Sequence, residues 1–195
     1  MIRTLSEKIV NTIMLEAEIQ TNKELYIYGL ECLISEFIGN LLLFITAILL
    51  GKLLEIVVWT IIFLAIRTQL GGYHCSSHFR CLIFSTILGI MSLVLNYYFI
   101  ILPNIALIIS IVCLPIIAKY APIIHKNHPL SNKQRKKAKK CVLIFYYIFF
   151  SIALLLKLYA SHLYAPICSG IITATILACM QLIIEHPTNK KATVR

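Results

Sequence analysis

The sequence contains no aspartate: its 8 acidic residues are all glutamates, and only 13% of its residues are charged. The missing aspartate excludes a Ser-His-Asp triad and an EF-hand calcium loop, both of which depend on that side chain. The 7 cysteines include no Cys-x-x-Cys pair, so neither a zinc ribbon nor a dithiol redox site is indicated. Their odd number and wide spacing fit no disulfide framework, and we expect most of them to be small buried hydrophobic residues.

Hydrophobic residues, in contrast, are abundant. They make up 59% of the 195 residues, and the mean hydropathy is +0.87. A soluble domain averages about 45–50% apolar and about 25% charged residues. The excess is too large for a buried core to hold. We therefore expect an all-α integral membrane protein with a single membrane domain, residues 1–195.

Apolar runs predict about six transmembrane helices, because they approach the ~20 residues that cross a bilayer. The runs occupy residues 25–50, 53–66 with an extension to 70, 81–101, 104–118, 141–156 and 162–184. Ahead of them, residues 1–24 place Leu5, Ile9 and Ile13 on one helical stripe. This predicts an amphipathic helix on the membrane surface. Residues 25–184 would then form the transmembrane bundle, and 185–195 a short basic tail.

The distribution of positive charge predicts the topology. The net charge is +10, and the chain has 18 lysines and arginines. The connections after the first, third and fifth predicted spans would lie together on one side of the membrane, and they contain only Lys52 and Lys157. The others lie at the N-terminus, in loops 67–80 and 119–140, and in the tail. Short loops rich in lysine and arginine stay on the cytoplasmic side. We expect a multi-pass cell-membrane protein with both termini and both loops in the cytoplasm, and no nucleic-acid partner is needed to explain the charge.

The polar segment 67–81, RTQLGGYHCSSHFRC, holds the residue types that cysteine catalysis requires. A histidine can remove the proton of a nearby thiol and leave the reactive thiolate. On spacing alone, His78 and Cys81 are the easier pair, because residues three apart meet on one helix. His74 would lie ~10 Å from Cys81 along a straight helix. It reaches Cys81 only if the Gly71–Gly72 stretch folds back as a loop.

Other interpretations of these residues stay open. His74, His78 and Cys81 could ligate a metal, but two histidines four apart without a nearby carboxylate are a weak signal. We expect no metal and no cofactor. Ser76 or Ser77 as a nucleophile lacks an acidic residue to orient its base. The segment could also be a solvated interfacial turn without chemistry.

A different class of function is open as well. Glu31, Glu36 and Glu55 fall in or near apolar runs, where an ionisable residue is costly and often functional. These glutamates would suit a small multi-pass transporter or channel. A sensor or scaffold subunit is a third alternative, for which changes at His74 and Cys81 would leave activity intact.

The order of residues in the polar segment resembles the AgrB family, accessory gene regulator protein B. The pattern is Arg67-x-x-x-Gly71-Gly72-x-His74-x-x-x-x-x-x-Cys81, followed by Ser85. A basic protein of this length with six spans is also similar to that family, as are Ala121-Pro122 and His128-Pro129-Leu130 before a lysine-rich stretch. The resemblance covers essentially the whole chain, and the polar segment is its specific part.

The resemblance implies a membrane cysteine endopeptidase of quorum sensing. Such an enzyme removes the C-terminal tail of a small propeptide, AgrD, and helps convert it into a cyclic thiolactone or lactone. The resemblance assigns Cys81 as the nucleophile and His74 as the general base, and gives supporting roles to Glu31, Arg67, Gly71 and Gly72. Cys75 departs from the family, which more usually has a small residue without a thiol there.

The positive charges would then have a second use. Arg67, Arg80, Lys133, Arg135 and Lys136 would attract the acidic tail of the precursor. Topology control alone also accounts for the lysine-rich cluster. The expected partners are an AgrD-like precursor peptide, membrane lipid and, by the resemblance, a second copy of the chain in a homodimer.

Overall fold

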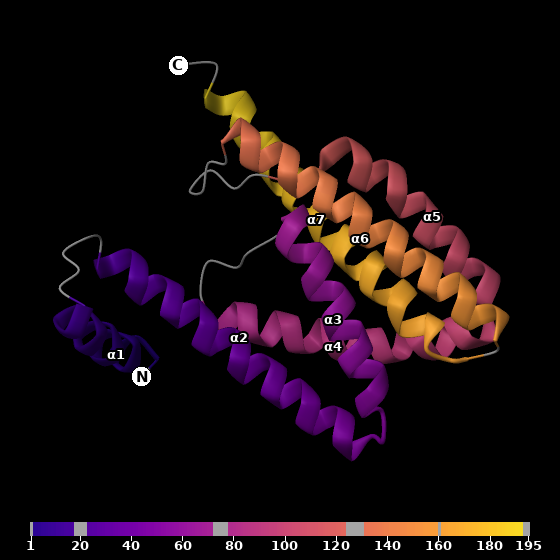
Figure 1. Ribbon diagram of the computed structural model, residues 1–195, viewed down its shortest axis with the longest axis horizontal. Coiled ribbons are helices and arrows are strands. Elements are labelled where there is room, and N and C mark those ends of the chain that lie inside the picture. Colours follow the sequence, from indigo (N-terminus) through magenta and orange to yellow (C-terminus); the bar gives the residue numbers. More distant parts are fainter. Residues whose placement is uncertain (1, 18–22, 72–77, 124–130, 160, 193–195) are drawn as a thin grey trace.

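Seven α-helices make up most of the computed structural model, which describes residues 2–17, 23–71, 78–123, 131–159 and 161–192 (Figure 1). In chain order they are α1 (Ile2–Ala17), α2 (Lys23–Leu49), α3 (Leu53–Leu70), α4 (His78–Ile101), α5 (Pro103–Tyr120), α6 (Asn132–Leu158) and α7 (Tyr164–Ala192). The described residues contain no strand.

The helices α2 to α7 are each long and apolar enough to cross a membrane. This confirms the prediction of an all-α, multi-pass membrane protein with six spans. The second span does include the extension beyond residue 66, because α3 continues to Leu70. Large side chains such as Phe37 and Leu158 stay 70% and 79% exposed, as lipid-facing positions require.

The boundaries of two predicted polar regions differ from the structure. Residues 132–140, expected in loop 119–140, belong to α6, and the expected tail is helical as far as Ala192. The start of α6 is fixed by Ser131, whose hydroxyl accepts from the Gln134 amide at 3.3 Å, while the Gln134 side chain accepts from the Ser131 amide at 2.9 Å. This capping box satisfies two backbone N–H groups at the start of the helix, and lysine is a good helix former. Hydropathy detects neither effect, which is why the helix begins before the apolar run.

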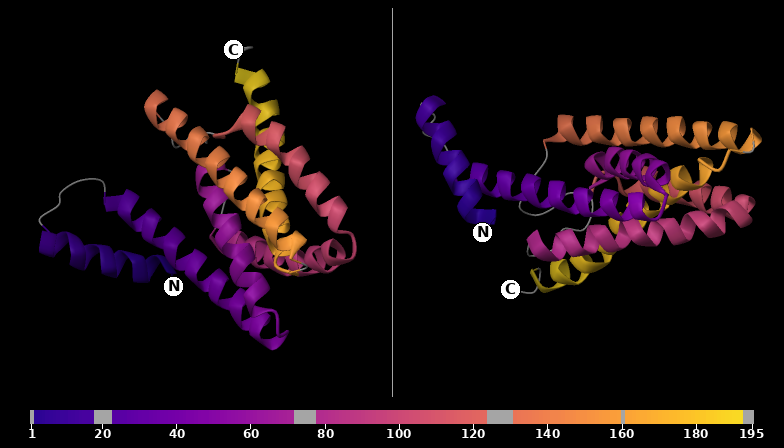
Figure 2. Two further views of the ribbon diagram at one scale, coloured as in Figure 1. Left: turned by 45° about the vertical axis from the view of Figure 1, so that its right-hand side comes forward. Right: turned by 90° about the horizontal axis from the view of Figure 1, so that it is seen from below.

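The last span, α7, lies at the centre of the bundle (Figures 1 and 2). Every residue from Tyr164 to Thr175 is buried, and α7 contacts α3, α4, α5 and α6. Its inner face is rich in small residues, including Ala165, Gly170 and Ala174. Small residues let membrane helices approach closely, and this packing holds such bundles together.

Helices α3 and α7 pack closely against each other. A Cβ added at Gly170 would lie 3.0 Å from Ile62 and 3.4 Å from the backbone nitrogen of Phe63. One turn further along, the indole Nε1–H of Trp59 donates to the hydroxyl oxygen of Thr173 at 3.2 Å. This contact joins α3 to the central helix α7.

Buried hydrogen bonds join the other helices of the bundle. The Tyr146 hydroxyl of α6 donates to the carbonyl of Ser110 in α5 at 2.7 Å, and the Tyr164 hydroxyl of α7 donates to the carbonyl of Phe99 in α4 at 2.7 Å. The Ser169 hydroxyl lies 2.6 Å from the Asn96 side chain. Such bonds add roughly 0.6 kcal/mol each in a membrane interior and fix the register of neighbouring helices.

The N-terminal helix α1 packs on α2, to one side of the bundle (Figure 2). Among residues 3–14 of α1, for which burial is described, Ser6 and Val10 are buried, whereas Leu5 and Ile13 of the predicted apolar stripe stay about half exposed. The contact with α2 therefore uses a face beside the stripe. The stripe itself remains available for a membrane surface, as an interfacial helix requires.

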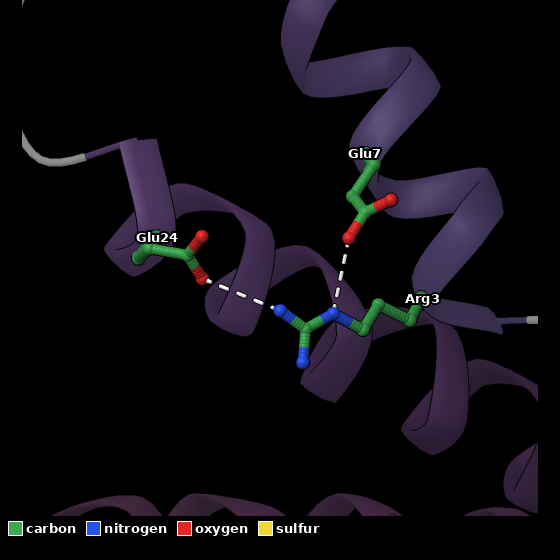
Figure 3. Close-up of polar contacts among 3 residues, drawn as sticks. All are labelled: Arg3, Glu7 and Glu24. Atoms are coloured by element: carbon green, nitrogen blue, oxygen red, sulfur yellow. Dashed lines mark hydrogen bonds and ion pairs between the residues drawn. The ribbon is translucent and has the colours of Figure 1, made fainter.

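An arginine links α1 to the start of α2 (Figure 3). The Arg3 guanidinium lies 3.0 Å from Glu7 on its own helix and 3.7 Å from Glu24 on α2. These carboxylates raise the pKa of Arg3, first through the hydrogen bond that Arg3 donates to Glu7 and then through the charge of Glu24. All of these groups are exposed, so the pairs orient the two helices more than they stabilise them.

Candidate functional site

The proposed catalytic residues lie where α3 ends and α4 begins. Residues 72–77, including Gly72 and His74, lie outside the described residues. Cys81 and Arg80 belong to the first turn of α4, together with His78, and their side chains are also outside the description. The roles of His74 and Cys81 therefore stay predictions, and the structure contributes the supports on either side of them.

The end of α3 has a backbone turn that only glycine adopts easily. Gly71 has φ 78° and ψ −174°, and its N–H donates to the carbonyl of Arg67 at 2.9 Å. Residues with a side chain are strained at positive φ. Helix α3 thus ends before Gly71, and α4 includes His78 and the residues that follow it. A pairing of His74 with Cys81 requires that these two residues do not lie on one straight helix, where they would be too far apart.

The chain segment that follows α5 packs against this turn. The N–H of Ile123, just after α5, donates to the carbonyl of Leu70 at 2.8 Å. Leu70, Ala121, Pro122 and Ile123 are all buried. Two stretches far apart in the sequence therefore meet at the point where the polar segment begins.

Arg67 stands at the end of a column of aromatic rings on α3. Its guanidinium carbon lies 5.5 Å from the centre of the Phe63 ring. Phe63 stacks on Trp59, with the ring centres 4.7 Å apart and the planes 11° from parallel. These residues are four apart and share one helical face. Because Trp59 is hydrogen-bonded to Thr173, the column connects the Arg67 side chain to the central helix α7.

Glu31 lies on α2 and is half-buried. Its charge contributes to the raised pKa of Arg3, after the contributions of Glu7 and Glu24. Glu31 therefore lies within electrostatic range of α1, and it has a polar partner. Its predicted supporting role is untested.

The other two glutamates are placed less favourably for a transport site. Glu36 is exposed, as expected for an interfacial residue. Glu55 lies in the first turn of α3 and pairs with the Lys52 side chain at 2.7 Å. This pair accounts for Glu55 at the end of the span without an ion or solute.

The positive charges of α6 fall on two faces. Lys133, Arg135 and Lys136 are all exposed. Arg135 is seven residues from Val142, a buried residue, and so lies on the face of α6 that packs on the bundle. Lys133 and Lys136 lie on a different face. Arg135 is therefore better placed than its neighbours to act at the end of the bundle.

The described cysteines outside the polar segment suit packing. Cys113 and Cys168 are buried between α5 and α7, and Cys141 and Cys179 are partly buried in spans. An apolar interior disfavours the thiolate that nucleophilic attack requires. Within the described residues no group of three or more His, Cys or Glu side chains is placed to hold a metal ion.

Sequence reasoning missed two supports, Ile123 and Phe63. Ile123 acts through a backbone contact between distant segments, which no local pattern encodes. Phe63 did carry a signal, because Trp59, Phe63 and Arg67 recur at intervals of four. An aromatic row leading to a charged residue at the end of a span indicates a ring contact with that charge.

Taken together, these features define a multi-pass α-helical membrane protein whose candidate site is a polar turn between two spans. The family model described as Accessory gene regulator B matches residues 6–184, and the chain belongs to this AgrB family. Membership fits a broad role in processing an AgrD-type propeptide by a peptidase-like protein. Comparisons with curated proteins and with solved structures gave no match.

Proposed function

We propose that this protein is a membrane cysteine endopeptidase that cuts the C-terminal tail from a small AgrD-like propeptide and promotes its cyclisation. The family match over residues 6–184 supports the class of substrate. The observation that carries the chemistry is the glycine turn that ends α3, followed by a new helix that bears Cys81. A His74–Cys81 pair requires that the two residues do not lie on one straight helix, and we place His74 ahead of α4, the helix that bears Cys81.

In the first half of the reaction, the imidazole of His74 takes the proton of the Cys81 thiol. The thiolate attacks the carbonyl carbon on the N-terminal side of the tail, and a tetrahedral adduct forms. The adduct collapses when the protonated imidazole gives its proton to the leaving nitrogen. The carbon–nitrogen bond breaks, the tail departs with a new amino terminus, and the rest of the precursor stays on Cys81 as a thioester.

In the second half, a thiol or hydroxyl within the precursor attacks the thioester. Its proton passes through His74 to the departing Cys81 sulfur, and the product is a thiolactone or lactone. For a thiol the exchange is nearly balanced in energy, because one thioester replaces another. Water would destroy the activated acyl group, so a site at the membrane surface with restricted water favours cyclisation.

The supports around the turn have distinct roles in this proposal. Arg67, aligned by the aromatic column, attracts the acidic tail or stabilises the negative charge of the adduct. Arg80, Lys133, Arg135 and Lys136 raise the local concentration of the tail. The site and both termini face the cytoplasm, and the surrounding lipid and a second copy of the chain complete the assembly.

The test is coexpression of the full chain with a candidate precursor, followed by mass spectrometry of the peptides. Cys81→Ala and His74→Ala should abolish tail release, since each removes one half of the dyad. Cys75→Ala is the matched thiol control and should retain release within about twofold. Normal processing by Cys81→Ala would refute the assignment, and processing lost only in Cys75→Ala would move the nucleophile to Cys75.

A further inference from the structure

The turn at Gly71 is held against the chain that follows α5. The Ile123 N–H donates to the Leu70 carbonyl at 2.8 Å, and the Ile123 carbonyl lies directly beside Gly71. A Cβ added at Gly71 would overlap the Ile123 carbonyl oxygen and lie 3.3 Å from its carbonyl carbon. The two closest atoms of Ile123 belong to its backbone, so a change of side-chain rotamer cannot relieve the overlap. Gly71 is thus required here for its positive φ and for the space it leaves.

Both sides of this contact are firmly anchored. Leu70 is 1% exposed, Ala121 3% and Ile123 9%. Ile117, one turn before Ala121, is fully buried. Since neither segment can move without disturbing packed side chains, a clash at Gly71 has to be relieved by the chain that begins at residue 72.

We propose that Leu70, Gly71 and Ile123 form a backbone clasp that positions the segment carrying His74, with Ile123 as the positioning residue. The inference rests on the proposed dyad and adds a residue outside the polar segment to its machinery. His74 follows Gly71 by three residues, a reach of at most ~11 Å of extended chain. A change of direction at Gly71 would therefore displace the start of the chain that leads to His74. In this view the connection after α5 is part of the catalytic support.

The chain offers a matched control for the glycine. Gly51, in the turn between α2 and α3, also has a positive φ, 65°, but a Cβ there would meet nothing within 4 Å. Gly51→Ala and Gly71→Ala both place a side chain at a positive φ, and only the second also closes the space beside Ile123. The ψ of −174° makes the strain at Gly71 the larger of the two, so Gly51→Ala controls for a side chain at positive φ rather than for the full strain. For the hydrogen bond, Ile123→Pro removes the donating N–H, whereas Ile123→Val keeps the N–H and most of the buried side chain.

The experiment uses the purified full-length protein in lipid nanodiscs with a synthetic precursor. Tail release is followed to give kcat and KM, and alkylation of Cys81 by iodoacetamide is followed by peptide mapping over a range of pH. Wild type and His74→Ala are the reference proteins. Thermal unfolding of each variant establishes that it is folded, and Gly51→Ala shows the effect of a side chain at positive φ.

We expect Gly71→Ala and Ile123→Pro to lower kcat at least tenfold with KM changed less than threefold. We also expect them to shift the onset of Cys81 alkylation to higher pH, as His74→Ala does, because the thiol loses its base. Gly51→Ala and Ile123→Val should stay within about twofold of wild type. A loss of packing alone would not reproduce the alkylation profile of His74→Ala.

Three results would overturn the clasp. If Gly71→Ala and Ile123→Pro release the tail like wild type while His74→Ala does not, the dyad stands and the positioning role is wrong. If the folded clasp variants lose release but alkylate with the wild-type pH profile, Ile123 does not act through His74. If His74→Ala itself releases the tail normally, the proposed dyad fails, and the positioning role fails with it.

Discussion

The indole of Trp59 donates a hydrogen bond to the hydroxyl of Thr173, 3.2 Å away across the interface of α3 and α7. Thr173 in turn donates to the carbonyl of Ser169 at 2.7 Å on its own helix. The bond is buried beside Gly170, where the two helices approach most closely. It anchors the helix that ends at the candidate site to the helix at the centre of the bundle.

Trp59→Phe tests this anchor. The change removes one buried hydrogen bond and part of the ring, so we expect a loss of about 1–3 kcal/mol in the free energy of unfolding. Thr173→Ser keeps the accepting hydroxyl and should cost less. Thermal unfolding in detergent, with retained secondary structure by circular dichroism, measures both. Equal stability of wild type and Trp59→Phe would show that the bond contributes nothing to the bundle.

Phe63→Leu tests the aromatic column beneath Arg67. Leucine keeps an apolar side chain in the core but removes the ring on which the guanidinium rests, a contact of about 0.5–1 kcal/mol. We expect kcat/KM for tail release to fall about two- to fivefold. Phe150, which stacks on Tyr146 away from this site, is the control, and Phe150→Leu should affect stability alone.

A double-mutant cycle separates this effect from general packing. If Phe63 acts through Arg67, Phe63→Leu should have no further effect on kcat/KM once Arg67→Ala is present. Phe63→Tyr, which keeps the ring face, should restore most of the activity. Additive losses in the cycle would show that Phe63 serves the core only.

The two faces of α6 predict a difference between neighbouring cations. Arg135 lies on the bundle side, so Arg135→Gln should raise KM for a precursor with an acidic tail more than Lys136→Gln does. The effect should shrink at high salt, because screening weakens attraction between exposed charges. Tail release at two salt concentrations measures it. Equal effects of the two changes would indicate that the cluster acts through total charge or topology.

The sequence predicted the helices well because hydropathy and helical spacing are local. Six spans and the extension of the second span to Leu70 follow from such patterns. The start of α6 was placed too late, since a lysine-rich helix outside the membrane has no hydropathy signal and depends on the Ser131 cap.

In the candidate site, too, local sequence patterns indicated some residues, and contacts between distant segments added others. The resemblance to the AgrB family pointed to Arg67, the glycine pair, His74 and Cys81, and their roles stay predictions. The family match itself spans residues 6–184. The contact of Ile123 with Leu70 joins segments more than 50 residues apart through backbone atoms, and backbone atoms carry no sequence signature. Spacing favoured His78 as the partner of Cys81, whereas the resemblance assigned His74, and that assignment stays a prediction.

The most direct test of the proposed chemistry is to look for the covalent intermediate. The full-length protein is mixed with precursor, quenched in acid and analysed by intact mass and peptide mapping. We predict an adduct on Cys81 equal in mass to the precursor without its tail, sensitive to hydroxylamine, retained in Cys75→Ala and absent in Cys81→Ala. Tail release without any adduct on Cys81, or an adduct that persists in Cys81→Ala, would contradict the account.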